Sequence, residues 1–253
     1  MDYFVNKESV ARKIWGSADT ILFVFAGASA EFALNKAVDW LYFTGRLPSD
    51  PVARLFSTVV YARKIVFSEK EEALKAIDKI TSIHTSVEVS RNDIIPDWAY
   101  RDVLFMLIHY SMASFELLHR KLTAPEKEDL FDIFFRVGQR MNLKGLPGNY
   151  TAWKKMHLEH LQQDLVKSHY TIDLYKQYRK HLGLIRYMFL IESQKLVCPP
   201  HVQKLLGLGK VVWVTPLLII YKLSRRIKLD WFLKSVLLPQ AYKKQIRDLD
   251  RVP

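Results

Sequence analysis

Hydrophobic residues recur at helical spacing along nearly the whole chain, and this pattern restricts the possible folds more than any other feature. Apolar positions follow one another at intervals of three and four, whereas segments of alternating apolar and polar residues between turn signals are absent. We therefore expect an all-α fold of about nine or ten packed helices. With 253 residues, 49% of them hydrophobic, residues 1–253 are expected to form one globular domain with a large core.

Start and stop signals divide this pattern into segments. Ser68 with Glu71, and Thr123 with Glu126, have the spacing of capping boxes and predict two helix starts. Residues 44–51 and 144–149 are predicted loops, and the "CPPH" stretch from Cys198 predicts a break. The expected helices cover about residues 7–15, 19–42, 52–67, 69–89, 97–121, 124–142, 151–167 and 171–195.

Disulfide, export and membrane-spanning signals are missing from the sequence. Cys198 is the only cysteine, so no internal disulfide can form, and we expect a single buried or loop thiol. The first 15 residues are charged and lack the apolar stretch of a signal peptide. The most apolar segments, residues 21–34 and 211–221, are shorter than the roughly 20 residues of a membrane span. A cytoplasmic protein is therefore expected.

The positive charge is concentrated in the last part of the chain. Residues 1–150 hold 19 Lys+Arg and 19 Asp+Glu, so the net charge of +12 falls entirely within residues 151–253. At about residues 200–253 these cations lie among apolar runs, a combination typical of peripheral contact with a membrane surface. Solvated helix faces are the ordinary alternative. Nucleic acid is not expected as a partner, because no nucleic-acid-binding motif accompanies the charge.

One histidine occupies a position where the helical pattern calls for an aliphatic residue. Ala73, Ile77, Ile80, His84 and Val87 form the inward seam of a predicted helix. Burying an imidazole without a partner costs about 1–3 kcal/mol. A neutral histidine facing a cavity between helices is the arrangement that a haem iron requires. A hydrogen bond to a backbone carbonyl is the alternative for such a residue.

Two other metal chemistries have weaker sequence support. A carboxylate-bridged di-iron site needs two Glu-x-x-His pairs, and the chain has one, Glu116 and His119. His157 and His160 lie three residues apart and could share a mononuclear zinc ion. Their surroundings, "KKMHLEHLQQ", are polar, so we expect a solvated helix face there instead.

The order of several segments resembles a known oxygenase family. The segments are "SVARKIWG" (9–16), "DPVARLFSTVVYARKIVFS" (50–68), "EKEEALKAIDKITSIHTSV" (69–87) and "VLFMLIHYSMASFELLHRKLTAPEKEDLF" (103–131). They are similar to stretches in the family that contains the fungal mycophenolic-acid-pathway oxygenases and the bacterial rubber oxygenases. The resemblance covers most of the chain, and it rests on the order of the segments rather than on any single motif.

The resemblance implies a buried haem b cofactor and assigns residues to it. His84 takes the place of the family's proximal iron ligand, and Arg54, Ser57 and Thr58 take the distal positions. Arg54 and Thr58, four residues apart, would share one helix face. An Asp50 ion pair is the alternative for Arg54, and a back-bond to the preceding turn is the alternative for Thr58. The chain also departs from the family, with "AGAS" (26–29) where many relatives carry His-Pro, and Ser57 replacing a basic residue.

The activity that the resemblance implies is cleavage of a C=C bond by dioxygen. The expected substrate is an isoprenoid or another lipid-like alkene, and the expected enzyme is a haem-dependent oxygenase. Asp39 and Glu31 are the carboxylates that we expect as candidates for removing an allylic proton, for which a raised pKa would suit them. A solvent-facing acid is the alternative for each. A non-enzymatic helical haem- or lipid-binding protein, or a haem-less family member, is the alternative function.

Overall fold

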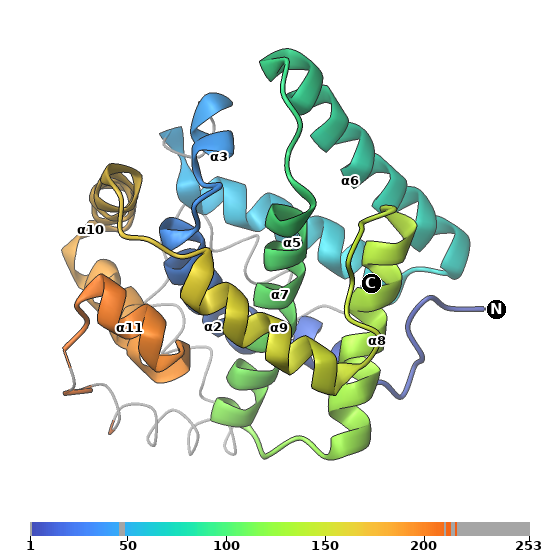
Figure 1. Cartoon of the computed structure of the whole chain (residues 1–253). Coiled ribbons are helices and arrows are strands. Elements are labelled where there is room, and N and C mark those ends of the chain that lie inside the picture. Colours follow the sequence, from blue (N-terminus) through green and yellow to red (C-terminus); the bar gives the residue numbers. More distant parts are fainter. Residues whose placement is uncertain (1, 46–48, 210, 214–215, 217–253) are drawn as a thin grey trace.

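Ten α-helices follow one another through residues 2–45, 49–209, 211–213 and 216, the part of the chain that the computed structural model describes, with the backbone alone for residues 51–55. No β-strand occurs in this part, so the all-α prediction is confirmed (Figure 1). The helices are α1 (Val10–Trp15), α2 (Ala18–Leu34), α3 (Asp39–Phe43), α5 (Pro51–Phe67), α6 (Lys70–Arg91), α7 (Asp97–Leu118), α8 (Ala124–Arg140), α9 (Tyr150–Gln163), α10 (His169–Val197) and α11 (Pro200–Leu206).

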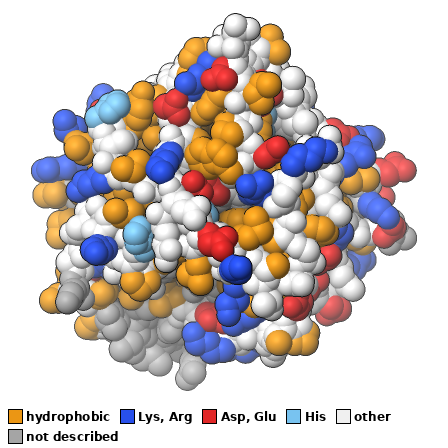
Figure 2. All heavy atoms as spheres, viewed as in Figure 1, with side chains coloured by type: hydrophobic (Ala, Val, Ile, Leu, Met, Phe, Trp, Pro, Cys, Tyr) orange, Lys and Arg blue, Asp and Glu red, His pale blue; other side chains and the backbone are white. Residues whose placement is uncertain are grey.

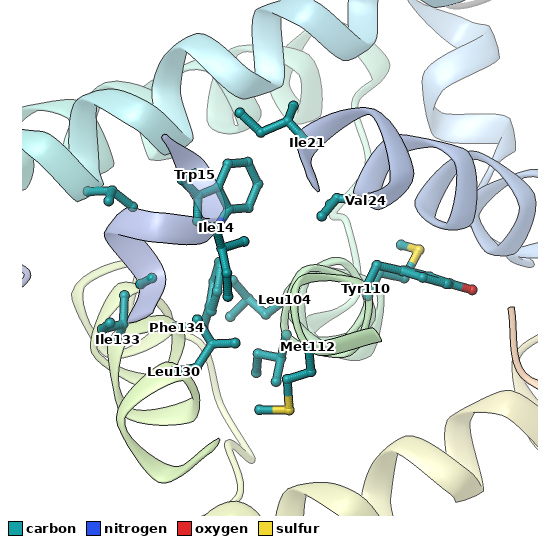
Figure 3. Packing of buried hydrophobic residues seen from close by; sticks show 14 of the residues in the cluster. Ile14, Trp15, Ile21, Val24, Leu104, Tyr110, Met112, Leu130, Ile133 and Phe134 are labelled. Carbon is teal, nitrogen blue, oxygen red and sulfur yellow. The ribbon is translucent and has the colours of Figure 1, made fainter. Parts of the chain in front are cut away.

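The two apolar helices α2 and α7 lie side by side at the centre of a single packed helical domain. Helix α10 packs along α2, α8 and α9 cover α7, and α5 pairs with α6, whose far end extends beyond the other helices in Figure 1. Trp15 of α1 lies against Phe134 of α8, and Leu104 of α7 lies beside Phe134 (Figure 3). The core therefore forms where α1, α2, α7 and α8 meet.

Helix starts follow the predicted capping chemistry in one case and depart from it in another. The Thr123 hydroxyl accepts a hydrogen bond from the Glu126 amide and the Glu126 carboxylate accepts one from the Thr123 amide, which confirms that capping box. The box predicted at Ser68 is wrong. Glu69, not Ser68, is the N-cap of α6, and its side chain makes no cap bond. Ser68 still belongs to the end of α5, because its amide donates to the Lys64 carbonyl.

The helix predicted over residues 19–42 is divided in two at Asn35. Asn35 takes an extended backbone conformation, and its side-chain oxygen accepts a hydrogen bond from the Ala37 amide at 2.8 Å. Asparagine competes in this way with the backbone bonds of a helix. Its amide nitrogen donates to Asp102 of α7 at 3.2 Å, so the break between α2 and α3 is fixed by a buried tertiary contact.

Helix α10 matches the segment predicted over residues 171–195, with an interruption inside it. Gly183 has a φ of +72°, a conformation that side chains with a Cβ rarely adopt, and the helix changes direction there. The break predicted at "CPPH" is confirmed, because Cys198 is the extended C-cap of α10 and α11 begins at Pro200. The lone thiol is buried.

The surface carries charges of both signs. On the face shown in Figure 2, Lys and Arg side chains are interspersed with Asp and Glu, and apolar side chains lie between them. Among the described residues, no helix is long and apolar enough to cross a membrane. The basic apolar segment predicted at about residues 200–253 lies almost entirely outside the described residues, so peripheral membrane contact stays a prediction.

A glycine of α2 lies directly against a buried aromatic ring of α7. A Cβ atom added to Gly27 would lie 2.0 Å from Cδ1 of Tyr110, whose side chain has no exposed surface. Figure 3 shows the Tyr110 ring leaving α7 on the side away from Trp15 and Ile133. Gly27 therefore makes room for the ring that separates the two helices.

We expect Gly27→Ala to lower the free energy of unfolding by about 2 kcal/mol, since overpacking of the Tyr110 ring outweighs the roughly 1 kcal/mol gain in helix propensity. Gly148→Ala is the matched control, because nothing lies within 4 Å of an added Cβ there. Urea denaturation of both variants measures the difference. Equal stability of the two variants would contradict the proposed close contact.

Candidate functional site

His84 lies on α6 where that helix leaves the core. The buried residues of α6 end at Ile77, and the His84 side chain is half-buried. Its ring meets the Tyr100 ring of α7 edge-on, with centroids 5.1 Å apart. The Tyr100 hydroxyl donates to Glu88 at 3.2 Å, which ties this part of α6 to the start of α7. The predicted seam therefore faces inward, but only its first two residues, Ala73 and Ile77, are fully buried.

The predicted distal residues lie on α5, the partner of α6. Thr58 is half-buried and Ser57 is exposed. Arg54 belongs to the first turns of α5, where the side chains lie outside the described residues. The fold thus brings the two predicted helices together, while the positions of the distal groups relative to His84 stay a prediction.

Asp39 connects α3 to the end of α6. Its carboxylate lies 2.7 Å from the Arg91 guanidinium, which also stacks over the Trp40 ring at 4.1 Å. Both members of the ion pair are partly exposed. As a candidate base, Asp39 would have to act from within this ion pair.

Glu31 has no exposed surface, which rules out the solvent-facing alternative for this carboxylate. The Tyr110 hydroxyl donates to Oε2 at 2.8 Å. Oε1 lies 3.4 Å from Nε2 of His160 and 3.8 Å from Nε2 of His157. Burial alone would raise the pKa of Glu31, but the two imidazoles outweigh it and lower the pKa to about 2. The raised pKa expected of a base is not found here.

The prediction that His157 and His160 lie on a solvated face is wrong, since each is only 4% exposed. They share the inner face of α9 with Trp153 and Leu161, whereas Leu158 points outward and is 57% exposed. These inner residues follow one another at intervals of four, three and one, which places them along one face of the helix. Grouping the histidines with Trp153 and Leu161 would have indicated their burial from the sequence.

A second carboxylate holds the other nitrogen of His160. Nδ1 of His160 lies 2.8 Å from Asp102 of α7 and 3.3 Å from Asp164. Burial would lower the pKa of His160, but Asp102 and Glu31 outweigh it and raise the pKa to about 10. Burial in turn raises the pKa of Asp102. His160 thus links carboxylates of α2 and α7.

His109 of α7, the residue before Tyr110, completes the cluster. Its ring lies 4.9 Å from the His157 ring, centroid to centroid, at an angle of 37°. Burial, followed by the proximity of His157, lowers the pKa of His109 to about 4, so the ring is neutral near pH 7. We call Glu31, His109, His157 and His160 the histidine–glutamate cluster.

The Glu-x-x-His pair considered for a di-iron site lies away from this cluster, near the molecular surface. Glu116 is paired with Lys121 at 2.9 Å and Lys127 at 3.2 Å. His119 is exposed and stacks on Phe115. A carboxylate already paired with two cations is a poor metal ligand.

Comparison with known proteins identifies a family. The model of the family described as "ER-bound oxygenase mpaB/B'/Rubber oxygenase, catalytic domain" matches residues 14–225, a range that contains every candidate site residue named above. No curated protein and no solved structure matches the chain.

We expect Tyr110→Phe to lower the free energy of unfolding by about 1.5–3 kcal/mol at pH 7, because the buried Glu31 carboxylate loses a hydrogen-bond donor. Tyr178→Phe is the matched control. Tyr178 is equally buried, but its hydroxyl donates only to the Ser29 carbonyl, at 3.4 Å, so its loss is expected to cost below about 1 kcal/mol. If guanidinium unfolding gives the same loss of stability for both variants, the Tyr110 hydroxyl does not stabilise the buried Glu31 carboxylate.

Proposed function

The chain belongs to the mpaB/rubber oxygenase catalytic-domain family, and on that premise we propose that it is a haem b-dependent oxygenase. It cleaves a C=C bond of an isoprenoid or other lipid-like alkene with dioxygen. The observation that carries this proposal is the family match over residues 14–225, which includes the helix of His84 and the helix before it.

His84 fits the role of proximal ligand in three respects. An imidazole is a common axial ligand of haem iron. The His84 ring is half-buried beside Tyr100, and no residue among 78–91, the outer half of α6, is fully buried. Helix α5, with Thr58, packs against α6. The bound haem would supply the activation of dioxygen.

The chain's own residues position and protect the substrate in this proposal. The Thr58 hydroxyl and the Arg54 guanidinium would hydrogen-bond the dioxygen substrate and orient it toward the alkene. The proton acceptor is Asp39 rather than Glu31. Asp39 is partly exposed and lies on α3, outside the buried cluster, whereas a carboxylate with a pKa of about 2 attracts protons weakly.

A membrane-surface location suits such a substrate. Lipid-like alkenes dissolve in bilayers, and the basic apolar segment at about residues 200–253 has the composition of an interfacial element. Apolar side chains of α10 beyond Gly183 are also exposed, at 58% for Leu184 and 70% for Ile185. Contact with the membrane through this end of the chain is part of the proposal.

We expect the protein purified from haem-replete cells to show a Soret band, and His84→Ala to lose it, because the iron loses its axial ligand. His169→Ala is the control, since His169 is exposed on α10 and stacks only on Tyr170. The pyridine haemochrome assay gives the haem content of each variant. A colourless wild-type protein would refute haem binding, and a Soret band retained in His84→Ala would refute this ligand.

Thr58→Ala and Arg54→Ala are each expected to keep the Soret band while oxygen uptake on a polyisoprenoid falls by roughly 10²-fold, since each removes a hydrogen-bond donor on the distal side. Thr151→Ala, at an exposed position of α9, is the control. An oxygen electrode and carbonyl analysis of the products measure the reaction. Bound haem without oxygen uptake on any alkene would favour the non-enzymatic carrier.

A further inference from the structure

Four buried side-chain atoms of the histidine–glutamate cluster have no hydrogen-bond partner in the described part of the chain. They are Oε1 of Glu31 and the Nε2 atoms of His109, His157 and His160. Each unpaired polar atom in a dry core costs about 1–3 kcal/mol. Such atoms are rare in folded proteins, and several together require an explanation such as a bound ion or ordered water.

Two of the distances among these atoms suit ligands of one ion. Oε1 of Glu31 lies 3.4 Å from Nε2 of His160 and 3.8 Å from Nε2 of His157. Two ligands that are each about 2.0–2.1 Å from a tetrahedral ion stand roughly 3.4 Å apart. The His157 ring centroid lies 6.2 Å from that of His160 and 4.9 Å from that of His109, so the His157 and His109 side chains must turn toward Glu31 for all four to share one ion.

The opposite edges of the same side chains are already held in place. The carboxylate of Asp102 lies 2.8 Å from Nδ1 of His160, and the Val197 backbone provides a hydrogen bond to His109. The Tyr110 hydroxyl holds Oε2 of Glu31. Histidines that ligate metals commonly donate their other N–H to a carboxylate or a backbone carbonyl, which orients the ring and fixes the tautomer. The cluster has this second layer of contacts.

We propose that Glu31, His109, His157 and His160 form a mononuclear binding site for a divalent first-row transition ion, Zn²⁺ or Fe²⁺. Three imidazoles and one carboxylate suit these ions, whereas Mg²⁺ and Ca²⁺ require oxygen ligands. The site is separate from the haem proposed at His84, because its ligands come from α2, α7 and α9 and none comes from α5 or α6. It does not depend on that proposal.

A second triad lies next to these ligands. Asp102, Asp164 and Nδ1 of His160 lie within 4.8 Å of one another. The 2.8 Å separation of Nδ1 from Asp102 is a hydrogen-bond length, and Asn35 donates to the same oxygen of Asp102. Contacts within the protein therefore already occupy this triad, whereas Nε2 of His160 makes no hydrogen bond and faces only Oε1 of Glu31, at 3.4 Å. Asp102 acts as a positioning residue in the proposal.

The role of the ion follows from its coordination. Four protein ligands at buried positions leave no open place for a substrate, which is typical of structural zinc sites. The ion joins α2, α7 and α9 at the junction that also holds Asn35 and Tyr110. Binding to the folded state alone stabilises that state by mass action.

The full-length protein, stripped with a chelator and dialysed, is titrated with Zn²⁺ and, as a spectroscopic probe, Co²⁺. We expect one equivalent to bind, the thermal midpoint to rise, and Co²⁺ to show the intense visible bands of tetrahedral coordination. Glu31→Gln, His109→Gln and His157→Gln each lower the affinity by more than about 100-fold, and Asp102→Asn lowers it by roughly 10–100-fold. The exposed Asp132→Asn stays near the wild type.

Binding of no ion by the wild-type protein would overturn the proposal, whatever the variants do. Loss of binding in Asp164→Asn together with normal binding in His109→Gln would assign the ion to the other triad and would also overturn it. His84→Ala separates this site from the haem, since it is expected to bind Zn²⁺ like the wild type. A protein without haem that binds one Zn²⁺ would refute only the haem proposal.

Discussion

The carboxylate of Glu31 lies in a part of the core from which water is excluded, and the surrounding helices are arranged around its charge. Removing an isolated charge from water costs several kcal/mol, so such a group persists only where partners meet it. Tyr110 of α7 supplies a hydroxyl, and His157 and His160 of α9 supply imidazoles. Helices α2, α7 and α9 are therefore joined by electrostatics as well as by apolar packing.

Much of the fold could be predicted from the sequence, because it depends on local patterns. The capping box at Thr123 and the break after α10 follow from short-range chemistry that a sequence displays directly. The break at Asn35 does not, because the amide of Asn35 reaches Asp102, whose side chain is brought there by another helix. The failure at Ser68 has a local cause. The Ser68 amide still donates to the Lys64 carbonyl, so Ser68 belongs to the end of α5.

The two candidate sites differ in how far sequence reasoning reaches them. His84 was visible as a polar residue in an apolar seam, and its role rests on the family. His157 and His160 stand in a stretch rich in lysine and glutamine, so their composition suggested solvent, whereas their angular position on α9 places them inside. The sequence presents Glu31 only as a candidate for proton transfer. Its actual surroundings depend on residues from α7 and α9 that no local pattern connects to α2.

The long separation of Glu31 from its partners along the chain has a consequence for biosynthesis. Tyr110 follows Glu31 by 79 residues, and His157 and His160 come later still. Helix α2 therefore leaves the ribosome long before the groups that balance its charge exist. Pairing of α2 with α7 alone would enclose a carboxylate that lacks its imidazoles. We therefore expect the centre of this domain to close only after α9 has been translated, with the nascent N-terminal half remaining open until then.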